Sequence, residues 1–375
     1  MRKKICNCLF TFTVVFTIAA CNDPIFFTIY QEVKPIDPRI MGAPSNFVIY
    51  KNAMYVASSD TIHRYDGSWG TISPPGGRIL KIASTDKYLY ALCYNDHSSG
   101  MDFVIKRFDG NIWETLGGDT DSHNSIQYIF AAGGVLFIGA ETDNVYSVLY
   151  IDENDTNKTI KKMTLLGLPE DRNAKNEISG ASIIGTDYYI STIGDGIFKT
   201  SNPASGATLI SDTLDIKFIS MINLNSTTIA LITRDGHIYT SPAFSRVGEI
   251  SLGNRFATGA LAVWENKDDP SQKLLLAGRQ DKLEYTVDSG YTYGYMELEL
   301  NSDGTIKSDS NFMEPGKRPV TTIVDGNERY ISTIGKYPVN HIFQATDGIL
   351  FASTQKNGVW SYRDRSGGYQ WNAEE

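Results

Sequence analysis

One short unit recurs along most of the sequence, and this repetition restricts the possible folds more than any other feature. The most recognisable part of the unit is an apolar run that ends in small residues and is bounded by Gly, Asp, Asn and Ser. Runs of β-branched and aromatic residues between turn-forming residues are typical of β-strands. Such runs lie at 54–57, 89–92, 136–139, 188–191, 228–231, 275–278 and 350–353. No stretch after residue 21 has a sustained helical period, so the sequence predicts an all-β protein.

The spacing of these runs indicates how the units are assembled. Equivalent residues of successive runs lie 35, 47, 52, 40, 46 and 76 positions apart, and another strand-like segment follows most of the runs. The blades of a β-propeller usually repeat every ~40–50 residues, and they are stable together because each sheet covers its neighbour. We therefore predict a β-propeller of about seven four-stranded blades, with an insertion near 285–340 in the long last interval.

Six or eight blades remain possible on the sequence alone. The letters YISTIG at Tyr189 to Gly194 recur at Tyr330 to Gly335, inside the long interval, and this echo allows an eighth blade. Six blades would result if the first unit were incomplete, and a β-sandwich with chance echoes is the alternative fold. The small residues that end the runs suit inner strands crowded near a propeller axis. A leftover strand-like run, 26–30, is expected to pair with the last unit and close the ring.

The first twenty residues have the pattern of a targeting signal. Arg2, Lys3 and Lys4 precede an uncharged apolar run at 5–20. As a helix this run would span about 24 Å, which is less than the ~30 Å hydrocarbon core of a bilayer. A basic stretch followed by a short apolar run predicts a signal peptide rather than a membrane-spanning helix. The segment Ile18-Ala19-Ala20-Cys21 at its end resembles the lipobox of bacterial lipoproteins.

The lipobox resemblance implies that residues 1–20 are removed and that Cys21 becomes the acylated first residue of a lipoprotein. Residues 21–24 would then be a lipidated N-terminus with a short tether, and residues 25–375 a single propeller domain. Two or three acyl chains, palmitate among them, would give a stable membrane attachment. Asn22 after the cysteine favours the outer membrane by resemblance to enterobacterial sorting, with a periplasmic or surface-exposed location in the bacterial cell envelope. An ordinary secretory signal with Cys21 present by chance is the alternative.

A second resemblance concerns a single turn. Thr286, Asp288, Gly290, Thr292 and Tyr293 follow the order Ser/Thr-x-Asp-x-Gly-x-Thr-aromatic, which is similar to the Asp box of BNR-type repeat propellers. The resemblance implies that Asp288 caps a tight turn, that Gly290 supplies a positive φ, and that Tyr293 packs between blades. These three residues are therefore interpreted as structural.

Sialidases also carry Asp boxes, so a glycan-acting hydrolase with its site in the central funnel is the rival function. Sialidase chemistry needs three arginines around a carboxylate, a Tyr paired with Glu, and an acid. Arg39, Arg234 and Arg279 could face the axis, but the segment 38–41 lacks the aromatic residue and the proline of the family's first arginine motif. No other catalytic, metal-ligand or cofactor motif is found, so we predict a protein that is not an enzyme and has no cofactor and no metal.

The net charge of the chain restricts the class of partner. The chain carries a formal charge of −9 and has no basic cluster, which argues against binding to nucleic acid. The leading prediction is a lipid-anchored, monomeric envelope propeller that acts as a non-catalytic binding or assembly platform. Its expected partner is an envelope protein or a glycan.

Overall fold

The computed structural model describes residues 40–97, 100–116, 125–143, 145–154, 159–168, 177–210, 213–249, 255–281, 294–307, 321–324, 327–330, 334, 338–355, 357–364 and 369–374. All of these residues belong to one compact unit, Pro38–Glu374. Within these ranges, no helix has both the length and the apolar character needed to cross a membrane.

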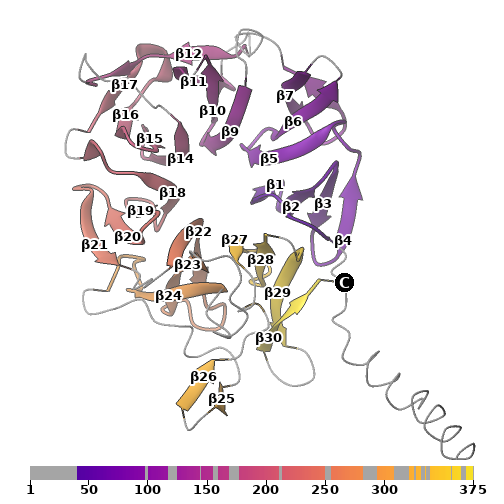
Figure 1. Ribbon diagram of the computed structural model, residues 1–375, viewed down its shortest axis with the longest axis vertical. Coiled ribbons are helices and arrows are strands. Elements are labelled where there is room, and N and C mark those ends of the chain that lie inside the picture. The colour runs from indigo at the N-terminus through magenta and orange to yellow at the C-terminus, as the bar shows by residue number, and fades with distance from the viewer. Residues whose placement is uncertain are drawn as a thin grey trace, which may run out of the picture. The chain divides into compact units, whose positions relative to one another are not determined.

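The described residues form seven antiparallel blades around a common axis, so the predicted propeller is confirmed with seven blades (Figure 1). In each blade the first strand along the chain lies at the axis and contacts the first strands of the neighbouring blades. The innermost strands of blades 1 to 7, numbered in chain order, are β1 (Phe47–Tyr50), β5 (Arg78–Ser84), β9 (Ser125–Ala132), β14 (Ile178–Ile184), β18 (Phe218–Asn223), β22 (Arg255–Glu265) and β27 (Val339–Gln344).

The remaining strands of each blade follow outward in chain order. The second strands are β2 (Ala53–Ser58), β6 (Leu89–His97), β10 (Val135–Thr142), β15 (Asp187–Thr192), β19 (Ile229–Thr233), β23 (Lys273–Asp281) and β28 (Leu350–Thr354). The third strands are β3 (Thr61–Tyr65), β7 (Gly100–Phe108), β11 (Val145–Asp152), β16 (Gly196–Thr200), β20 (His237–Thr240), β24 (Gly294–Leu300) and β29 (Val359–Asp364). The fourth strands are β4 (Trp69–Ile72), β8 (Trp113–Thr115), β12 (Lys161–Met163), β17 (Ala207–Leu209), β21 (Ser245–Glu249) and β30 (Tyr369–Ala373).

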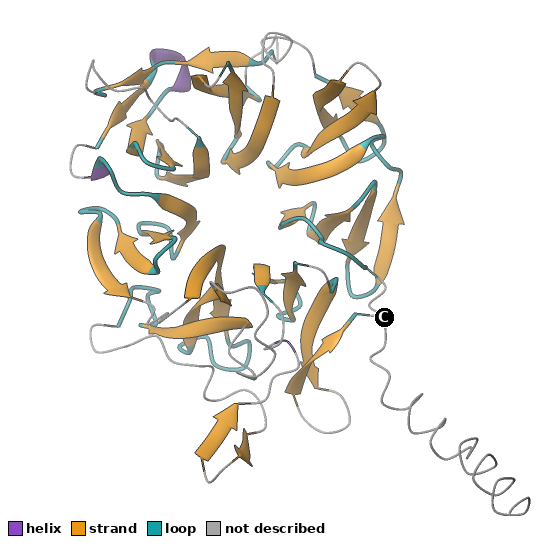
Figure 2. Cartoon of the chain, in the orientation of Figure 1, coloured by secondary structure: helices purple, strands orange, loops and turns teal. Residues whose placement is uncertain are grey.

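Two blades depart from the four-stranded pattern. Blade 4 gains a fifth strand, β13 (Leu165–Leu166), which pairs in parallel with β17, and in blade 6 three strands are described. A short 3-10 helix, η2 (Pro203–Ser205), precedes β17, and Figure 2 shows how little helix accompanies the strands.

Each pair of neighbouring blades buries its own apolar cluster. The buried apolar residues of the described part fall into seven such clusters, one at each interface around the ring. Leu92 of β6 and Leu136 of β10, for example, are fully buried in the cluster between blades 2 and 3. Full burial of one such side chain contributes about 1.5–3 kcal/mol. Each blade is therefore stabilised mainly by the two blades beside it.

The small residues at the ends of the predicted runs lie on the second strands, next to the innermost strands. A Cβ atom added to Gly139 would lie 2.9 Å from Cγ1 of Ile178, at the start of the next innermost strand. A Cβ atom added to Gly278 would lie 2.4 Å from the carbonyl oxygen of Val339, again at the start of the next innermost strand. These positions are small because the innermost strand of the neighbouring blade packs directly onto them.

The turn from the second to the third strand is capped in the same way in blades 4, 5 and 7. Thr192, Thr233 and Thr354 each end a second strand. The hydroxyls of Thr192 and Thr354 donate to carbonyl oxygens beyond the turn at 3.0 and 3.1 Å, and that of Thr233 is shared between Asp235 Oδ1 at 2.5 Å and the His237 carbonyl oxygen at 3.3 Å. The same hydroxyl oxygens accept backbone N–H groups of Asp195, His237 and Asn357. This threonine satisfies a donor and an acceptor that the turn would otherwise leave unpaired.

The segment before β1 helps to close the ring. The backbone N–H of Val359 donates to the carbonyl oxygen of Ile40 at 3.0 Å, and that of Gly358 donates to Gly42 at 2.9 Å. These bonds join the beginning of the described chain to β29 of blade 7. The strand-like run 26–30, which was expected to make such a clasp, lies outside the described residues.

A buried carboxylate completes the closure between blades 7 and 1. Glu374, only 3% exposed, accepts hydrogen bonds from Trp69 Nε1 at 2.6 Å and Arg363 Nη2 at 2.9 Å. Ser361 Oγ donates to the same carboxylate. Because Trp69 belongs to β4 and the other residues to blade 7, this carboxylate links the last blade to the first.

The repeated YISTIG letters do not mark an eighth blade in the described structure. The second copy begins at Tyr330, the last residue of β26 (Asn327–Tyr330), and residues 331–333 are outside the described ranges. β26 pairs with β25 (Thr321–Val324) in a two-stranded hairpin within the predicted insertion.

Candidate binding site at the propeller axis

The innermost strands share an irregularity near their first residues. Single residues stand out of register with the second strand in blades 2, 3, 4, 5 and 7, and the bulge in blade 6 is longer. In blade 1 the N–H of Ser45 donates to Ala57, although Phe47 pairs with Val56, so Asn46 is the extra residue. Bulges of this kind redirect side chains and are frequent beside functional sites. The residues that directly follow the bulges of different blades therefore lie at the same level along the propeller axis.

In three blades the residue directly after the bulge has an ionisable side chain. Blade 2 places Lys81 there, blade 3 places Tyr128, and blade 7 places His341. Blades 1, 4 and 5 place Phe47, Gly180 and Ser220 at the same register position. Three side chains from distant parts of the sequence therefore occupy one level around the axis. We call Lys81, Tyr128 and His341, together with Phe130, the axial site.

Lys81 reaches across to the innermost strand of the next blade. Its Nζ lies 4.5 Å from the ring centroid of Phe130 and 5.3 Å from that of Tyr128, both on β9. Within the described part of the chain, the ammonium group has no hydrogen-bond or ion-pair partner. Burial lowers the pKa of Lys81 to about 8, and no charged side chain offsets this effect. The group remains partly exposed, so a ligand at the axis could reach it.

His341 lies close enough to Lys81 to experience its charge. Burial first and the charge of Lys81 second lower the pKa of His341 to about 3, so the imidazole is neutral at pH 7. Its side chain is partly exposed, and among the described residues neither ring nitrogen has a hydrogen-bond partner. A neutral imidazole can donate one hydrogen bond and accept another.

Tyr128 is fixed in orientation by its neighbours. Its ring stacks on Phe130 with centroids 6.3 Å apart at 20° between the planes. Burial first, and then the charge of Glu177 and a hydrogen bond with it, raise the pKa of Tyr128 to about 12. The aromatic pair beneath the ammonium group is thus stacked, and the tyrosine stays protonated at neutral pH.

Two exposed apolar side chains lie on the side of the propeller where the innermost strands begin. We call the side of the propeller on which the innermost strands begin the top face; the turns from second to third strands lie on it too. Leu80, the bulge residue before Lys81, is 39% exposed, and Met41 is 56% exposed. Met41 is next to the β2–β3 turn because its carbonyl oxygen accepts from Ser58 Oγ at 2.7 Å. The N–H of Ile79 donates to Ser59 in the same turn.

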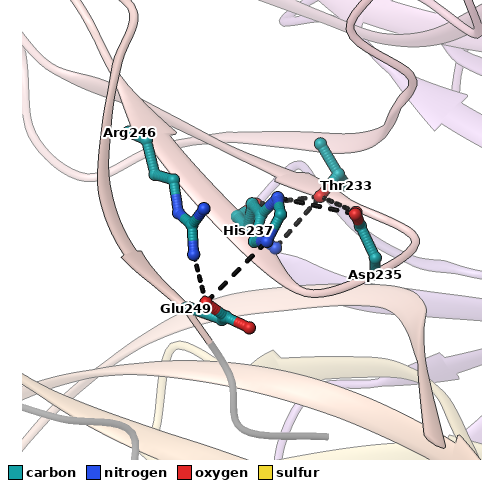
Figure 3. A network of polar contacts seen from close by, with 5 residues as sticks. All are labelled: Thr233, Asp235, His237, Arg246 and Glu249. Carbon is teal, nitrogen blue, oxygen red and sulfur yellow. Dashed lines mark hydrogen bonds and ion pairs between the residues drawn. The ribbon is translucent and has the colours of Figure 1, made fainter.

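Blade 5 carries a second polar cluster at the top face, shown in Figure 3. His237 Nδ1 lies 3.5 Å from Asp235 and its Nε2 lies 3.8 Å from Glu249, and Arg246 pairs with Glu249. Partial burial of Asp235 opposes ionisation, but the hydrogen bond from Thr233 and the charges of His237 and Arg246 lower its pKa overall. Because Thr233 and His237 form the same capped turn as in blades 4 and 7, we interpret this cluster as structural.

The described residues also bear on the predicted chemistry. They contain no group of three His, Cys, Asp or Glu side chains that could hold a metal ion. Arg234 is exposed in the β19–β20 turn. Arg39 and the side chain of Arg279 lie outside the described part, as do Cys21 and the turn residues Asp288, Gly290 and Tyr293.

Sequence reasoning missed the axial site. Lys81 and His341 each interrupt an apolar first strand, in the runs Ile79 to Ala83 and Val339 to Phe343. A charged or polar residue at the same place in two first strands was a usable signal. It could be read only after the first strands were aligned by their bulges, which the sequence does not mark.

Comparison with known proteins shows the fold and no family. No protein-family model and no curated protein matches the sequence. The solved structure of YCF48 bound to D1 peptide aligns with 12% identity and a TM-score of 0.52, covering 88% of this chain and 94% of that chain. The WD40 β-propeller domain of Doa1 aligns with 10% identity and a TM-score of 0.54, covering 88% and 96%.

A bacterial extracellular protein has the same fold. The extracellular domain of a putative hybrid two-component system from B. thetaiotaomicron aligns with 13% identity and a TM-score of 0.54. The alignment covers 87% of this chain and 39% of that domain, so the present chain matches well under half of its length. These structures are similar to this chain in fold alone: it is an all-β, seven-bladed propeller.

Proposed function

We propose that this protein is a non-catalytic platform in the bacterial cell envelope that binds a protein partner over the top face of its propeller. The axial site carries this proposal. A stacked aromatic pair, an unpaired ammonium group and a neutral imidazole meet at the axis. Exposed Leu80 directly precedes Lys81, and exposed Met41 lies at the β2–β3 turn of the same face. Aromatic and apolar anchors around a few polar groups are typical of protein-binding surfaces.

The comparisons support a protein partner in an extracytoplasmic setting. YCF48, a propeller of similar fold, has been solved bound to a peptide. The propeller from B. thetaiotaomicron belongs to an extracellular domain. We propose that this chain is held at the envelope, with the outer membrane favoured, through acylated Cys21, and that the Asp288, Gly290 and Tyr293 turn is structural.

Site-specific crosslinking in intact cells tests the platform. A photoreactive amino acid replaces Leu80 on the top face or, as the control, Ile112, which is 67% exposed in the β7–β8 turn on the opposite face. We expect one envelope protein to be captured repeatedly from position 80 and not from position 112. Capture of the same proteins from both positions would contradict a top-face partner. Release of sugar from a glycan panel by the purified protein would instead favour the hydrolase.

The anchor is tested separately. Cells fed with an alkyne-tagged palmitate should label the wild-type protein and leave Cys21→Ser unlabelled. Labelling that persists in Cys21→Ser would contradict acylation at this residue.

A further inference from the structure

We propose that the axial site binds one carboxylate group of the protein partner, held by Lys81 and His341, with the adjoining apolar part of the partner on Phe130 and Phe343. This inference rests on the proposed function and specifies its ligand. It assigns recognition of an acidic side chain or a C-terminus to the centre of the propeller.

The charge balance around Lys81 calls for an anion. Its only described contacts beyond ordinary packing are the faces of Phe130 and Tyr128, at 4.5 and 5.3 Å. No acidic residue raises the pKa of Lys81, because burial is the sole cause of the change in this pKa. A partly buried cation without a counterion is unfavourable, and a ligand carboxylate would supply a charge-assisted hydrogen bond.

The amount of charge favours a carboxylate over a phosphate. His341 is neutral at pH 7, so Lys81 supplies the single positive charge of the axial site. A monoanion matches one positive charge, whereas a phosphate close to −2 would remain partly uncompensated. The neutral imidazole adds one N–H donor, which suits the second oxygen of a carboxylate.

The surroundings favour a carboxylate attached to an apolar segment. Phe343 lies two residues beyond His341 on β27 and is partly exposed, with its ring 6.2 Å from that of Phe47. Phe130 is also partly exposed below Lys81. Phe130 and Phe343 each follow a residue of the axial site by two positions on the same strand, and their partly exposed rings provide contact area for the side chains or backbone beside an acidic residue.

Protection of Lys81 from chemical modification tests the proposal. The full chain is treated near pH 8 with an amine-reactive reagent, and the labelling rate of each lysine is measured by peptide mass spectrometry. The probes are 3-phenylpropionate, its uncharged amide 3-phenylpropionamide, phenyl phosphate and glucuronate. Lys199 is the internal control, because it also lies over an aromatic ring, 5.5 Å from Tyr189, but is paired with Asp187 at 2.8 Å.

We expect 3-phenylpropionate to slow labelling of Lys81 in a saturable manner and to leave Lys199 unchanged. In His341→Phe the half-protecting concentration should rise about fivefold, which corresponds to the loss of one hydrogen bond. Equal protection by the amide would overturn the carboxylate assignment, as would stronger protection by phenyl phosphate. Stronger protection by glucuronate would overturn the protein source, and absence of protection by any probe would overturn the site.

These results are separable from the test of the platform. If crosslinking from position 80 captures the same partner in wild type and in Lys81→Met, the platform stands and the carboxylate site falls. If 3-phenylpropionate protects Lys81 but no partner is captured, the carboxylate site stands and the platform falls.

Discussion

Replacing Lys81 by methionine should stabilise the protein at pH 7 while removing the only cation of the axial site. Burial lowers the pKa of Lys81 from 10.5 to about 8. At about 1.4 kcal/mol per pH unit, this shift corresponds to ~3 kcal/mol of destabilisation while the lysine is charged in both the folded and unfolded states. The contacts with Tyr128 and Phe130 return about 1–2 kcal/mol, because cation–π interactions strengthen when they are desolvated. The net gain expected for Lys81→Met is therefore about 1–2 kcal/mol.

The pH dependence gives this prediction a specific signature. The folded-state pKa of Lys81 is lowered, so the cost is fully present below pH 8 and disappears as the pH rises toward 10.5. Urea denaturation of the full chain at pH 7 and pH 10 should show a gain in Lys81→Met at pH 7 that has largely vanished at pH 10. Lys199→Met, the matched control, removes a lysine paired with Asp187 and should give a small loss or no change. A loss of stability in Lys81→Met at pH 7, or a gain of equal size at both pH values, would refute the reasoning.

Three further substitutions test other parts of the structure. Burial and the charge of Lys81 lower the pKa of His341 to about 3, so the free energy of unfolding of the wild type should fall by about 1.4 kcal/mol per pH unit below about pH 6. Acid titrations of His341→Phe should lack this slope, and an unchanged slope would contradict the assignment. Glu374→Gln weakens the charge-assisted bonds between blades 7 and 1 and should cost about 2 kcal/mol in urea denaturation, whereas a neutral result would assign closure to other contacts. Gly278→Ala should lower the melting temperature, at a cost of about 1–3 kcal/mol, because the added Cβ would lie 2.4 Å from the carbonyl oxygen of Val339. Gly248→Ala is the control and should leave the melting temperature unchanged, because no atom lies within 4 Å of its Cβ position.

Much of the fold could be predicted because short local runs of sequence specify the individual strands. The runs at 54–57, 136–139 and 350–353 lie within β2, β10 and β28, and all seven predicted runs coincide with second strands. These strands are buried on both faces, so they appear in the sequence as short continuous apolar runs between turn residues. The first strands were harder to recognise because their bulges interrupt the alternation of inward and outward residues. The exact count of blades also required the structure, since the YISTIG echo leads into a hairpin rather than a blade.

The axial site could not be predicted in the same way. Lys81, Tyr128 and His341 belong to blades 2, 3 and 7 and have no common spacing in the sequence. In the sequence His341 belongs to no catalytic or metal-ligand motif. Their convergence depends on the ring, which brings the first strands of all blades to one axis, and on the bulges, which align the next residue of each strand.

The sequence by itself determined that this chain is an all-β propeller, because repeated local patterns specify strands and their turns. Its lipobox-like segment also predicts an anchor at Cys21, which lies outside the described residues. The tertiary structure decided which polar residues meet, which of them remain unpaired, and how far burial alters their ionisation. Those properties depend on distances between blades far apart in the chain, and such distances exist only once the ring has closed.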